Sequence, residues 1–230
     1  MLEQGYSSEI YTSGYKIYST LDLRIQQVAE EAVKNGPVTL KTALAKSLNA
    51  ATVRLADHLG VRSVIETARR LGIKSELQPY LPTALSASDV TLLEMVSAYS
   101  IFATGMYAEL LPYERIVNRD GIIIEETTPE TNKVIDEGIV NEMKVLLGAV
   151  AKEGIAQKAK ELGRPVYGKT GTTNDFTDAW FIGSDDRLAV GVWVRRDDHK
   201  PIGLKETGAR TALPIWIGFM KKVPLQTLLD

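Results

Sequence analysis

The sequence predicts an α+β fold in which helices pack on an antiparallel sheet. Two observations support this class. Residues 39–152 are dominated by apolar residues at helical spacing, and three short apolar segments follow at 165–173, 178–184 and 188–195. Helices followed by strands with short connections are typical of α+β domains. Hydrophobic residues make up 44% of the chain and charged residues 24%, which is ordinary for a globular protein.

Composition excludes several classes of function. The net charge of −2 gives no basic footprint, so we expect no nucleic-acid partner. The absence of cysteine excludes disulfides and thiolate metal sites. No apolar run reaches the ~18 residues that span a bilayer, and the start of the chain lacks the features of a signal peptide. Any membrane anchor of the parent protein is therefore expected outside this chain.

The N-terminal part predicts a strand, a helix and a break. Residues 10–20 are expected to be extended, and Asp22 is expected to cap a helix that runs to Val33. The apolar face of this helix holds Ile25, Val28, Ala29 and Ala32. Asn35-Gly36-Pro37 then breaks the chain. We expect residues 1–36 to be a linker and residues 37–230 to be the main domain.

The middle of the chain predicts a run of helices. Thr39 is expected to cap a helix that carries Leu40, Ala43, Leu44 and Ser47 on one face. Shorter helices are expected at 51–59 and 63–71, the second ending at Gly72, and residues 73–90 are expected to be a loop. Thr91 and Glu94 form a capping-box pattern at the start of the next helix.

The rest of the chain predicts hairpins and two further helices. Residues 110–130 are expected to form a strand pair that turns at 118–121. A long helix is expected at 136–152 and an apolar one at 213–222. Residues 184–187 are expected to join the last two strands as a hairpin.

Lys169-Thr170-Gly171, followed by Thr172 and Thr173, is the pattern with the clearest chemistry. On an edge strand, the lysine supplies positive charge and the threonine hydroxyls donate hydrogen bonds. Gly171 allows a ligand to approach the main chain closely because it has no Cβ. This pattern is typical of a strand that holds a carboxylate.

Ser47-Leu48-Asn49 is a second candidate motif, placed at the end of a predicted helix. Serine and asparagine favour helix ends for local reasons, so by itself the motif indicates only a helix terminus. Its position upstream of the Lys169 strand favours a functional interpretation.

These residues resemble the transpeptidase domain of class A penicillin-binding proteins, which are serine D,D-transpeptidases. The resemblance implies the fold shared by penicillin-binding transpeptidases and β-lactamases. It covers nearly the whole chain, in the segments 18–22, 39–49, 91–99, 169–175, 179–181 and 212–216.

The resemblance implies a role for each site residue. Ser47 would relay a proton, Asn49 would orient the amide of the donor peptide, and Lys169 would support the electrostatic field. The expected substrate-binding residues are Thr170, Gly171, Thr172 and Thr173. Of these, the hydroxyls of Thr170 and Thr172 would bind a terminal carboxylate. The main-chain N–H of Thr172 would form half of an oxyanion hole.

One expected part of the family is missing. The family's nucleophile is the serine of a Ser-x-x-Lys motif, whose lysine helps to activate it. That segment lies between the first helix and the Ser-x-Asn helix, but here only Lys34–Val38 joins them. The one literal match, Ser13 to Lys16, lies in an expected strand, where an offset of three directs the two side chains to opposite faces.

The implied function is acyl transfer from D-Ala-D-Ala stem peptides in peptidoglycan synthesis, with no metal or cofactor. The implied partners are the stem peptide, β-lactams, and a glycosyltransferase domain or membrane anchor of the parent protein. The implied location is the extracytoplasmic face of the bacterial inner membrane, on its periplasmic side. We expect this chain to be inactive by itself for want of the nucleophile segment.

Three alternatives remain. The first alternative is a non-catalytic protein that binds stem peptides or acts as a scaffold. The second is a degenerate fragment, and the third is a stand-alone β-lactamase. The linker-like segment upstream and the C-terminal segment argue against the last.

Other polar and aromatic residues are expected to be structural. His58 and His199 have no neighbours at metal-ligand spacing, and Asp197-Asp198 is typical of a charged strand end or turn. The three tryptophans are expected to be core residues: Trp180, Trp193 and Trp216.

Overall fold

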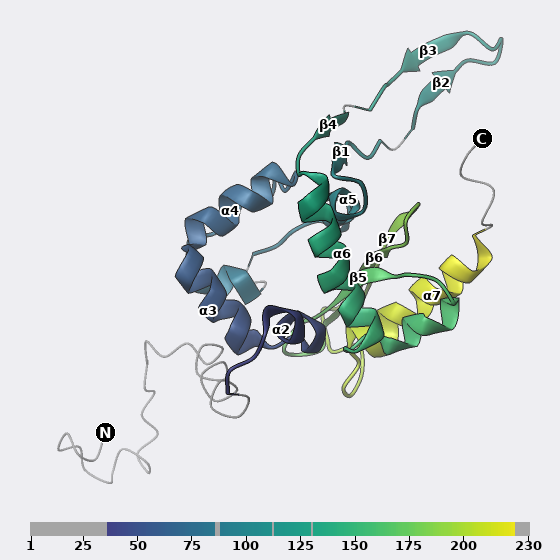
Figure 1. Ribbon diagram of the computed structural model, residues 1–230. Coiled ribbons are helices and arrows are strands. Elements are labelled where there is room, and N and C mark those ends of the chain that lie inside the picture. Colours follow the sequence, from purple (N-terminus) through teal and green to yellow (C-terminus); the bar gives the residue numbers. More distant parts are fainter. Residues whose placement is uncertain (1–35, 86–87, 112, 130, 224–230) are drawn as a thin grey trace, which may run out of the picture.

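The computed structural model describes residues 36–85, 88–111, 113–129 and 131–223 (Figure 1). The strand expected at 10–20, the helix expected at 22–33 and the Ser13–Lys16 pair lie outside these described residues. Within them, the predicted α+β class is confirmed, because an antiparallel sheet is covered by helices on both faces.

The central sheet contains β5 (Tyr167–Thr172), β6 (Asp178–Ser184) and β7 (Ala189–Arg195), paired antiparallel in that order. All three strands were predicted, with ends that differ by at most two residues. In the β6–β7 turn, the carboxylate of Asp185 accepts hydrogen bonds from the N–H groups of Arg187 and Leu188, both at 2.9 Å. This confirms the hairpin expected at 184–187.

Helices cover the two faces of this sheet. On one face, α5 (Leu92–Thr104) approaches so closely that a Cβ at Gly191 would meet the side chains of Val96 and Leu92. On the opposite face, α7 (Leu213–Lys222) buries Trp216, whose indole N–H donates to the carbonyl of Val190 at 3.0 Å. The core beneath α7 includes Phe181, Val150, Val166, Leu213, Ile217 and Met220.

Four further α-helices and the 3₁₀ helix η3 lie in the described part of the chain. Helix α6 (Glu137–Lys152) contacts α2, α5 and β5. The others follow one another between residues 40 and 85: α2 (Leu40–Lys46), α3 (Asn49–Leu59), α4 (Val61–Arg70) and η3 (Leu81–Leu85). The helix η3 corrects the expectation of a loop at 73–90, and Leu40 is exposed.

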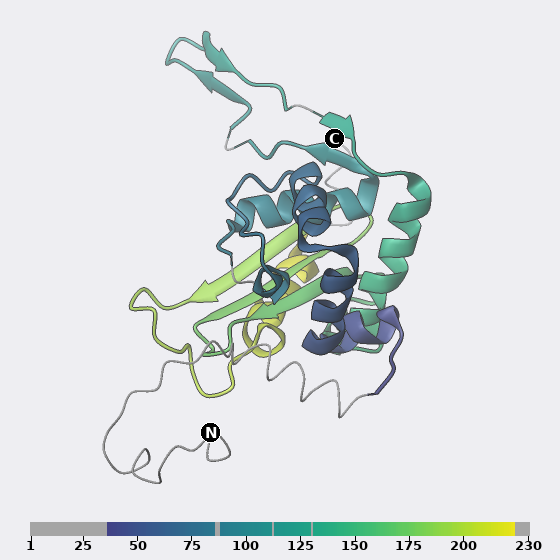
Figure 2. The same cartoon turned by 90° about the vertical axis from the view of Figure 1, so that its left-hand side faces the viewer.

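Residues 106–133 form an arm that projects from the body in Figures 1 and 2. Its outer part is the predicted strand pair, β2 (Arg115–Val117) and β3 (Ile123–Glu126), joined by a turn in which Asn118 Oδ1 accepts from Asp120 N and Ile122 N. Its base is a pair that the sequence did not predict, β1 (Met106–Ala108) with β4 (Thr131–Lys133).

Two helical turns near the C-terminal half were also not predicted. One is η4 (Gln157–Leu162), a 3₁₀ helix before β5. The other is η5 (Gly208–Ala212), a π turn that leads directly into α7. Turns of this kind have too few residues to show a periodic pattern of apolar residues, so they cannot be predicted from that pattern.

The end of α2 has a left-handed residue that is not glycine. Thr39 caps the start, accepting from Thr42 N at 3.2 Å as predicted. At the other end, Ser47 N donates to Leu44 O at 3.2 Å and Leu48 N donates to Ala43 O at 2.9 Å. This is a Schellman motif, whose left-handed position usually holds glycine. Here it holds Ser47, with φ 56° and ψ 51°.

We predict that Ser47→Gly is more stable than Ser47→Ala by about 1 kcal/mol, because only glycine adopts this backbone conformation without cost. Both variants lose the hydroxyl, so their difference isolates the backbone term. Urea denaturation of the two purified variants measures it. As a control, Ser63 lies in the regular helix α4, where the Ala variant should be the more stable by a similar margin. Equal stabilities at position 47 would contradict the prediction.

The capping box of α5 is formed as the sequence predicted. Thr91 Oγ1 accepts from Glu94 N at 3.2 Å, and Glu94 Oε2 accepts from Thr91 N at 2.9 Å. Glu94 also accepts hydrogen bonds from the main-chain N–H and the hydroxyl of Ser75. Burial raises the pKa of Glu94, but these hydrogen bonds outweigh it and lower the pKa from 4.5 to about 2.

We predict that Glu94→Gln lowers the free energy of unfolding by about 1–2 kcal/mol at pH 7, because a charged acceptor is lost. A carboxylate whose pKa is lower in the folded than in the unfolded protein stabilises the fold at pH values above its unfolded pKa. This stabilisation is lost as the pH falls toward the folded pKa. The gap between wild type and variant should therefore narrow from pH 4.5 toward pH 2. Chemical denaturation at several pH values measures it, with the exposed Glu66→Gln as control. A gap that stays constant over this window would refute the assignment.

Candidate functional site

Ser47 and Lys169 meet although 122 residues separate them in sequence. Lys169 Nζ donates to Ser47 Oγ at 2.7 Å and to Thr170 O at 3.0 Å. Ser47 comes from the end of α2 and Lys169 from β5, so the contact joins the helical part to the sheet. This distance brings the two side chains together, and their use as one ligand site stays a prediction.

The lysine is only partly exposed and makes no ion pair with a described residue. Burial lowers the pKa of Lys169 from 10.5 to about 8. A buried cation without a carboxylate partner is costly. A lysine held in this way is typical of a functional site, and an incoming carboxylate would supply the missing negative charge.

The outer edge of β5 carries main-chain groups toward the site. Thr173 N donates to Asp178 O of β6 at 3.2 Å. Because antiparallel pairing alternates along a strand, Thr170 and Thr172 direct their N–H and C=O groups away from β6. In the described residues β5 pairs only with β6, so β5 is an edge strand, as the sequence predicted.

The side chains of β5 alternate between the two faces of the sheet. Lys169 is the partner of Ile182 in β6, and Ile182 is in turn the partner of Gly191 in β7. Partners in neighbouring strands point to the same face, and a Cβ at Gly191 would meet α5, so Lys169 lies on the α5 face. Thr170 is the partner of Phe181, which belongs to the core beneath α7, so the side chains of Thr170 and Thr172 project from the opposite face of the sheet. Thr170 is 9% exposed, whereas Thr172 is exposed at the end of the strand.

Gly208 is a neighbour of the site that the sequence analysis missed. Its N–H donates to Thr172 Oγ1 at 3.0 Å. A Cβ at position 208 would collide with the carbonyl oxygens of Trp180 and Gly171. Since Thr172 Oγ1 accepts this bond, its own hydroxyl proton is free to be donated. A close main-chain approach leaves no pattern in the sequence beyond the glycine itself.

Asn49 and Thr173 are placed differently from Ser47. Asn49 is the first residue of α3, it is exposed, and its side chain makes no hydrogen bond with a described residue. Thr173 Oγ1 accepts from the N–H groups of Thr177 and Asp178 and contacts the Thr177 hydroxyl. Thr173 therefore orders the turn between β5 and β6, and its contact with a ligand stays a prediction.

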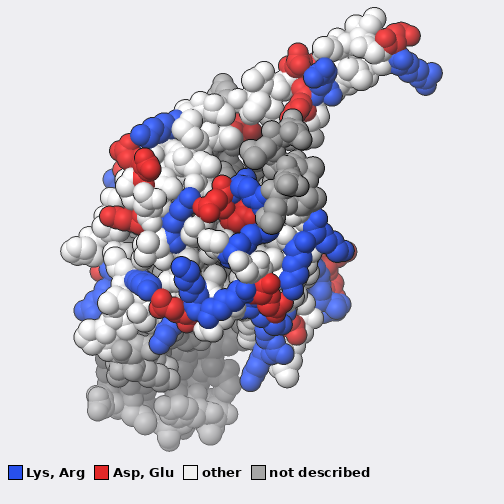
Figure 3. All heavy atoms as spheres, turned by 45° about the vertical axis from the view of Figure 1, so that its right-hand side comes forward, with Lys and Arg blue, Asp and Glu red and all other residues white. Residues whose placement is uncertain are grey.

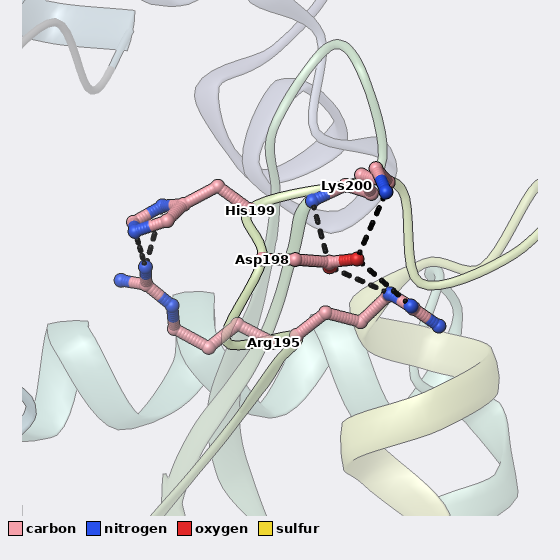
Figure 4. A network of polar contacts seen from close by, with 5 residues as sticks. Arg195, Asp198, His199 and Lys200 are labelled. Carbon is pink, nitrogen blue, oxygen red and sulfur yellow. Dashed lines mark hydrogen bonds and ion pairs between the residues drawn. The ribbon is translucent and has the colours of Figure 1, made fainter.

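The loop after β7 holds the charged residues that the sequence assigned to a turn (Figure 4). Asp198 accepts from Arg196 and Lys200, and these bonds lower its pKa. The guanidinium of Arg195 contacts the ring of His199 (Figure 4). No cluster of metal-ligating side chains occurs among the described residues.

The tryptophans differ from the expectation that all three are core residues. Trp216 is fully buried, but Trp193 is 38% exposed and Trp180 is partly exposed. Trp180 and Trp193 stack with ring centroids 5.0 Å apart, and Arg195 lies over Trp193 at 5.1 Å. Cross-strand stacking explains their position, because it stabilises a sheet surface without full burial.

Charge on the surface is mixed. On the face drawn in Figure 3, Lys and Arg side chains are interspersed with Asp and Glu. Among the described helices, none combines the length and the apolar character needed to cross a bilayer.

Comparison with known proteins places this site in a family. Residues 2–194 match the family model described as the penicillin binding protein transpeptidase domain. The chain is 42% identical over 190 residues to penicillin-binding protein 1A of Aquifex aeolicus, covering 82% of this chain and 26% of that protein. It is 33% identical over 195 residues to penicillin-binding protein 1A of Neisseria gonorrhoeae, covering 81% of this chain and 24% of that protein.

Solved structures give the same result. The fold matches penicillin-binding protein 1A from Haemophilus influenzae with a TM-score of 0.75 and 25% identity, over 81% of this chain and 34% of that one. It also matches penicillin-binding protein A from M. tuberculosis, solved as an imipenem acyl-enzyme complex, with a TM-score of 0.66 and 22% identity, over 80% of this chain and 47% of that one. The chain thus spans about a quarter of the length of the curated relatives and under half of these two structures. On these matches, the chain belongs to the family of penicillin-binding protein transpeptidase domains, and to its class A branch.

Proposed function

We propose that this chain binds the D-Ala-D-Ala end of a peptidoglycan stem peptide, and β-lactams in its place, along the open edge of β5. The reaction to which this binding belongs is acyl transfer: a serine attacks D-Ala-D-Ala, D-Ala leaves, and the acyl group passes to an amine of a neighbouring stem. The observation that carries the proposal is the 2.7 Å contact between Lys169 Nζ and Ser47 Oγ.

The carboxylate is bound at the end of β5 in this proposal. Lys169 lacks a carboxylate partner among the described residues, and its charge attracts one. The hydroxyl oxygen of Thr172 accepts from Gly208 N–H, and its proton is donated to no described residue, so it can be donated to a ligand. The main-chain N–H of Thr172 points away from β6 and would donate to a developing oxyanion. Thr170 would add a second hydroxyl, and Gly171 admits the ligand close to the strand.

Proton transfer is the part assigned to Ser47. Its hydroxyl oxygen accepts from Lys169, which leaves the hydroxyl proton directed elsewhere. A hydroxyl between a cationic amine and a leaving group passes a proton in two short steps. Asn49, exposed two residues further on, would orient the donor peptide's amide through its side-chain carboxamide.

The nucleophile is the part that this chain does not supply in a recognisable form. Its single Ser-x-x-Lys sequence is Ser13 to Lys16. We propose that acylation needs a segment that this chain lacks, and that the parent protein carries a glycosyltransferase domain and a membrane anchor on the periplasmic side. The resemblance to full-length penicillin-binding protein 1A supports this context.

The second candidate function is non-covalent binding of stem peptides without catalysis. The missing nucleophile favours it, because the carboxylate-binding edge of β5 is formed without one. A degenerate chain without any binding is the third possibility, and the two experiments that follow separate the three.

We predict that the purified chain forms no covalent adduct with a fluorescent penicillin. Acylation needs a hydroxyl activated by a neighbouring base, and the oxyanion hole lacks the donor on the nucleophile's own main chain. Loss of one such donor typically slows the reaction by about 10²–10³-fold. A denaturing gel after incubation measures the adduct. A stoichiometric labelled band that disappears in Ser47→Ala or Ser13→Ala would identify the nucleophile and refute the prediction.

We predict that the chain binds a diacetylated Lys-D-Ala-D-Ala peptide and that binding weakens as pH rises through about 8, where Lys169 loses its charge. The expected loss between pH 7 and pH 9.5 is about tenfold, the worth of one charged hydrogen bond. Titration calorimetry measures the affinity at each pH.

Two variants control this measurement. Lys169→Gln should bind the peptide weakly and show no such pH dependence. Lys46 is an exposed lysine at the end of α2, directly before Ser47, and Lys46→Gln should behave as wild type. No binding at any pH would refute the proposed function. Binding with the same pH dependence in Lys169→Gln would remove Lys169 from the site.

A further inference from the structure

A pocket of about 480 Å³ lies beside the candidate site and is not used in the function proposed above. One wall is the segment after α6, with Ile155 and Lys158, and the other is the segment from Glu206 to Leu213. The pocket is lined by Ile155, by Leu213, which is only 1% exposed, and by three charged residues: Lys158, Glu206 and Arg210.

Both walls are fixed by main-chain contacts to the site. Ile155 N donates to Ala45 O at 3.1 Å, two residues before Ser47. A Cβ at Gly154 would collide with the same carbonyl oxygen. On the other wall, Gly208 N donates to Thr172 Oγ1. The pocket therefore has walls of fixed spacing, and it is a neighbour of the open edge of β5.

The charges in the pocket are not matched to one another. Lys158, Glu206 and Arg210 form no ion pair with each other or with another described residue. The Glu206 carboxylate is held by one hydrogen bond, from Thr211 Oγ1 to Oε2 at 2.6 Å, and Oε1 has no partner among the described residues. Opposite charges that share a small pocket without pairing leave both signs available to a ligand.

We propose that this pocket binds the head group of a free amino acid, which carries an ammonium and a carboxylate on one carbon. The carboxylate would lie between Arg210 and Lys158, and the ammonium against Glu206. Two of the three charges are positive, so a simple anion would also be attracted, and the contact of the ammonium with Glu206 would favour an amino acid over it. Ile155 would contact a small side chain. The inference does not depend on the function proposed for Ser47 and Lys169.

Amide NMR titration of the whole chain with D-alanine tests this proposal. We expect saturable shifts at the main-chain amides of Ile155, Ala209 and Arg210. N-acetyl-D-alanine lacks the ammonium and D-alaninamide lacks the carboxylate, so each should bind about tenfold more weakly. Absence of saturable shifts, shifts confined to Thr172 and its neighbours, or binding of both derivatives as tightly as D-alanine would each overturn the proposal.

Charge-neutral variants assign the two halves of the head group. Glu206→Gln should bind D-alanine and N-acetyl-D-alanine equally. Arg210→Gln should reduce the preference for D-alanine over D-alaninamide, and the double variant Lys158→Gln/Arg210→Gln should abolish it. Arg70→Gln, at the exposed end of α4, is the matched control and should retain both preferences. Thermal unfolding shows that each variant is folded. Folded variants that retain both preferences would place the ligand elsewhere and overturn the proposal.

Discussion

The hydrogen bond from Lys169 to Ser47 is the constraint on which the site depends. It places a cation in a partly buried position with a hydroxyl and a carbonyl as its partners. Neither partner carries charge, so the cost of burying the ammonium is only partly offset. Ser47, which accepts this hydrogen bond, occupies a left-handed position where glycine would be less strained. Burial of the Lys169 ammonium and the left-handed backbone of Ser47 each lower the free energy of unfolding. Such local costs are typical of functional sites.

Close main-chain packing gives this hydrogen bond its geometry. Gly191 lets α5 approach the sheet, Gly208 lets η5 lie against β5, and Gly154 lets the segment after α6 reach the end of α2. At each position a Cβ would collide with a neighbour. At Gly208 and Gly154 these neighbours are main-chain carbonyl groups, and at Gly191 they are the side chains of Val96 and Leu92. Ser47, Lys169 and Thr172 therefore belong to segments that pack closely against one another. Protein interiors transmit such spacing because they are close-packed.

Local chemistry could be predicted from the sequence wherever it depends on neighbours along the chain. The Thr91–Glu94 capping box, the three central strands and the helix end at Ser47 are of this kind, and all are present. The approach of Ser47 to Lys169 was predictable only through the family resemblance, since 122 residues separate them. Gly208, the exposed Trp193 and the charged pocket were missed because each depends on tertiary contacts that leave no periodic pattern.

The helical part of the described chain leaves apolar side chains in solvent. Leu40, Leu55 and Leu59 are 59%, 38% and 54% exposed, and the first two line a groove beside α2 and α3. Helix α2 therefore carries an exposed leucine at its start and, just after its end, the hydroxyl of Ser47 that accepts from Lys169. A carboxylate ligand can supply the negative charge that Lys169 lacks, whereas only an apolar element can cover the leucines.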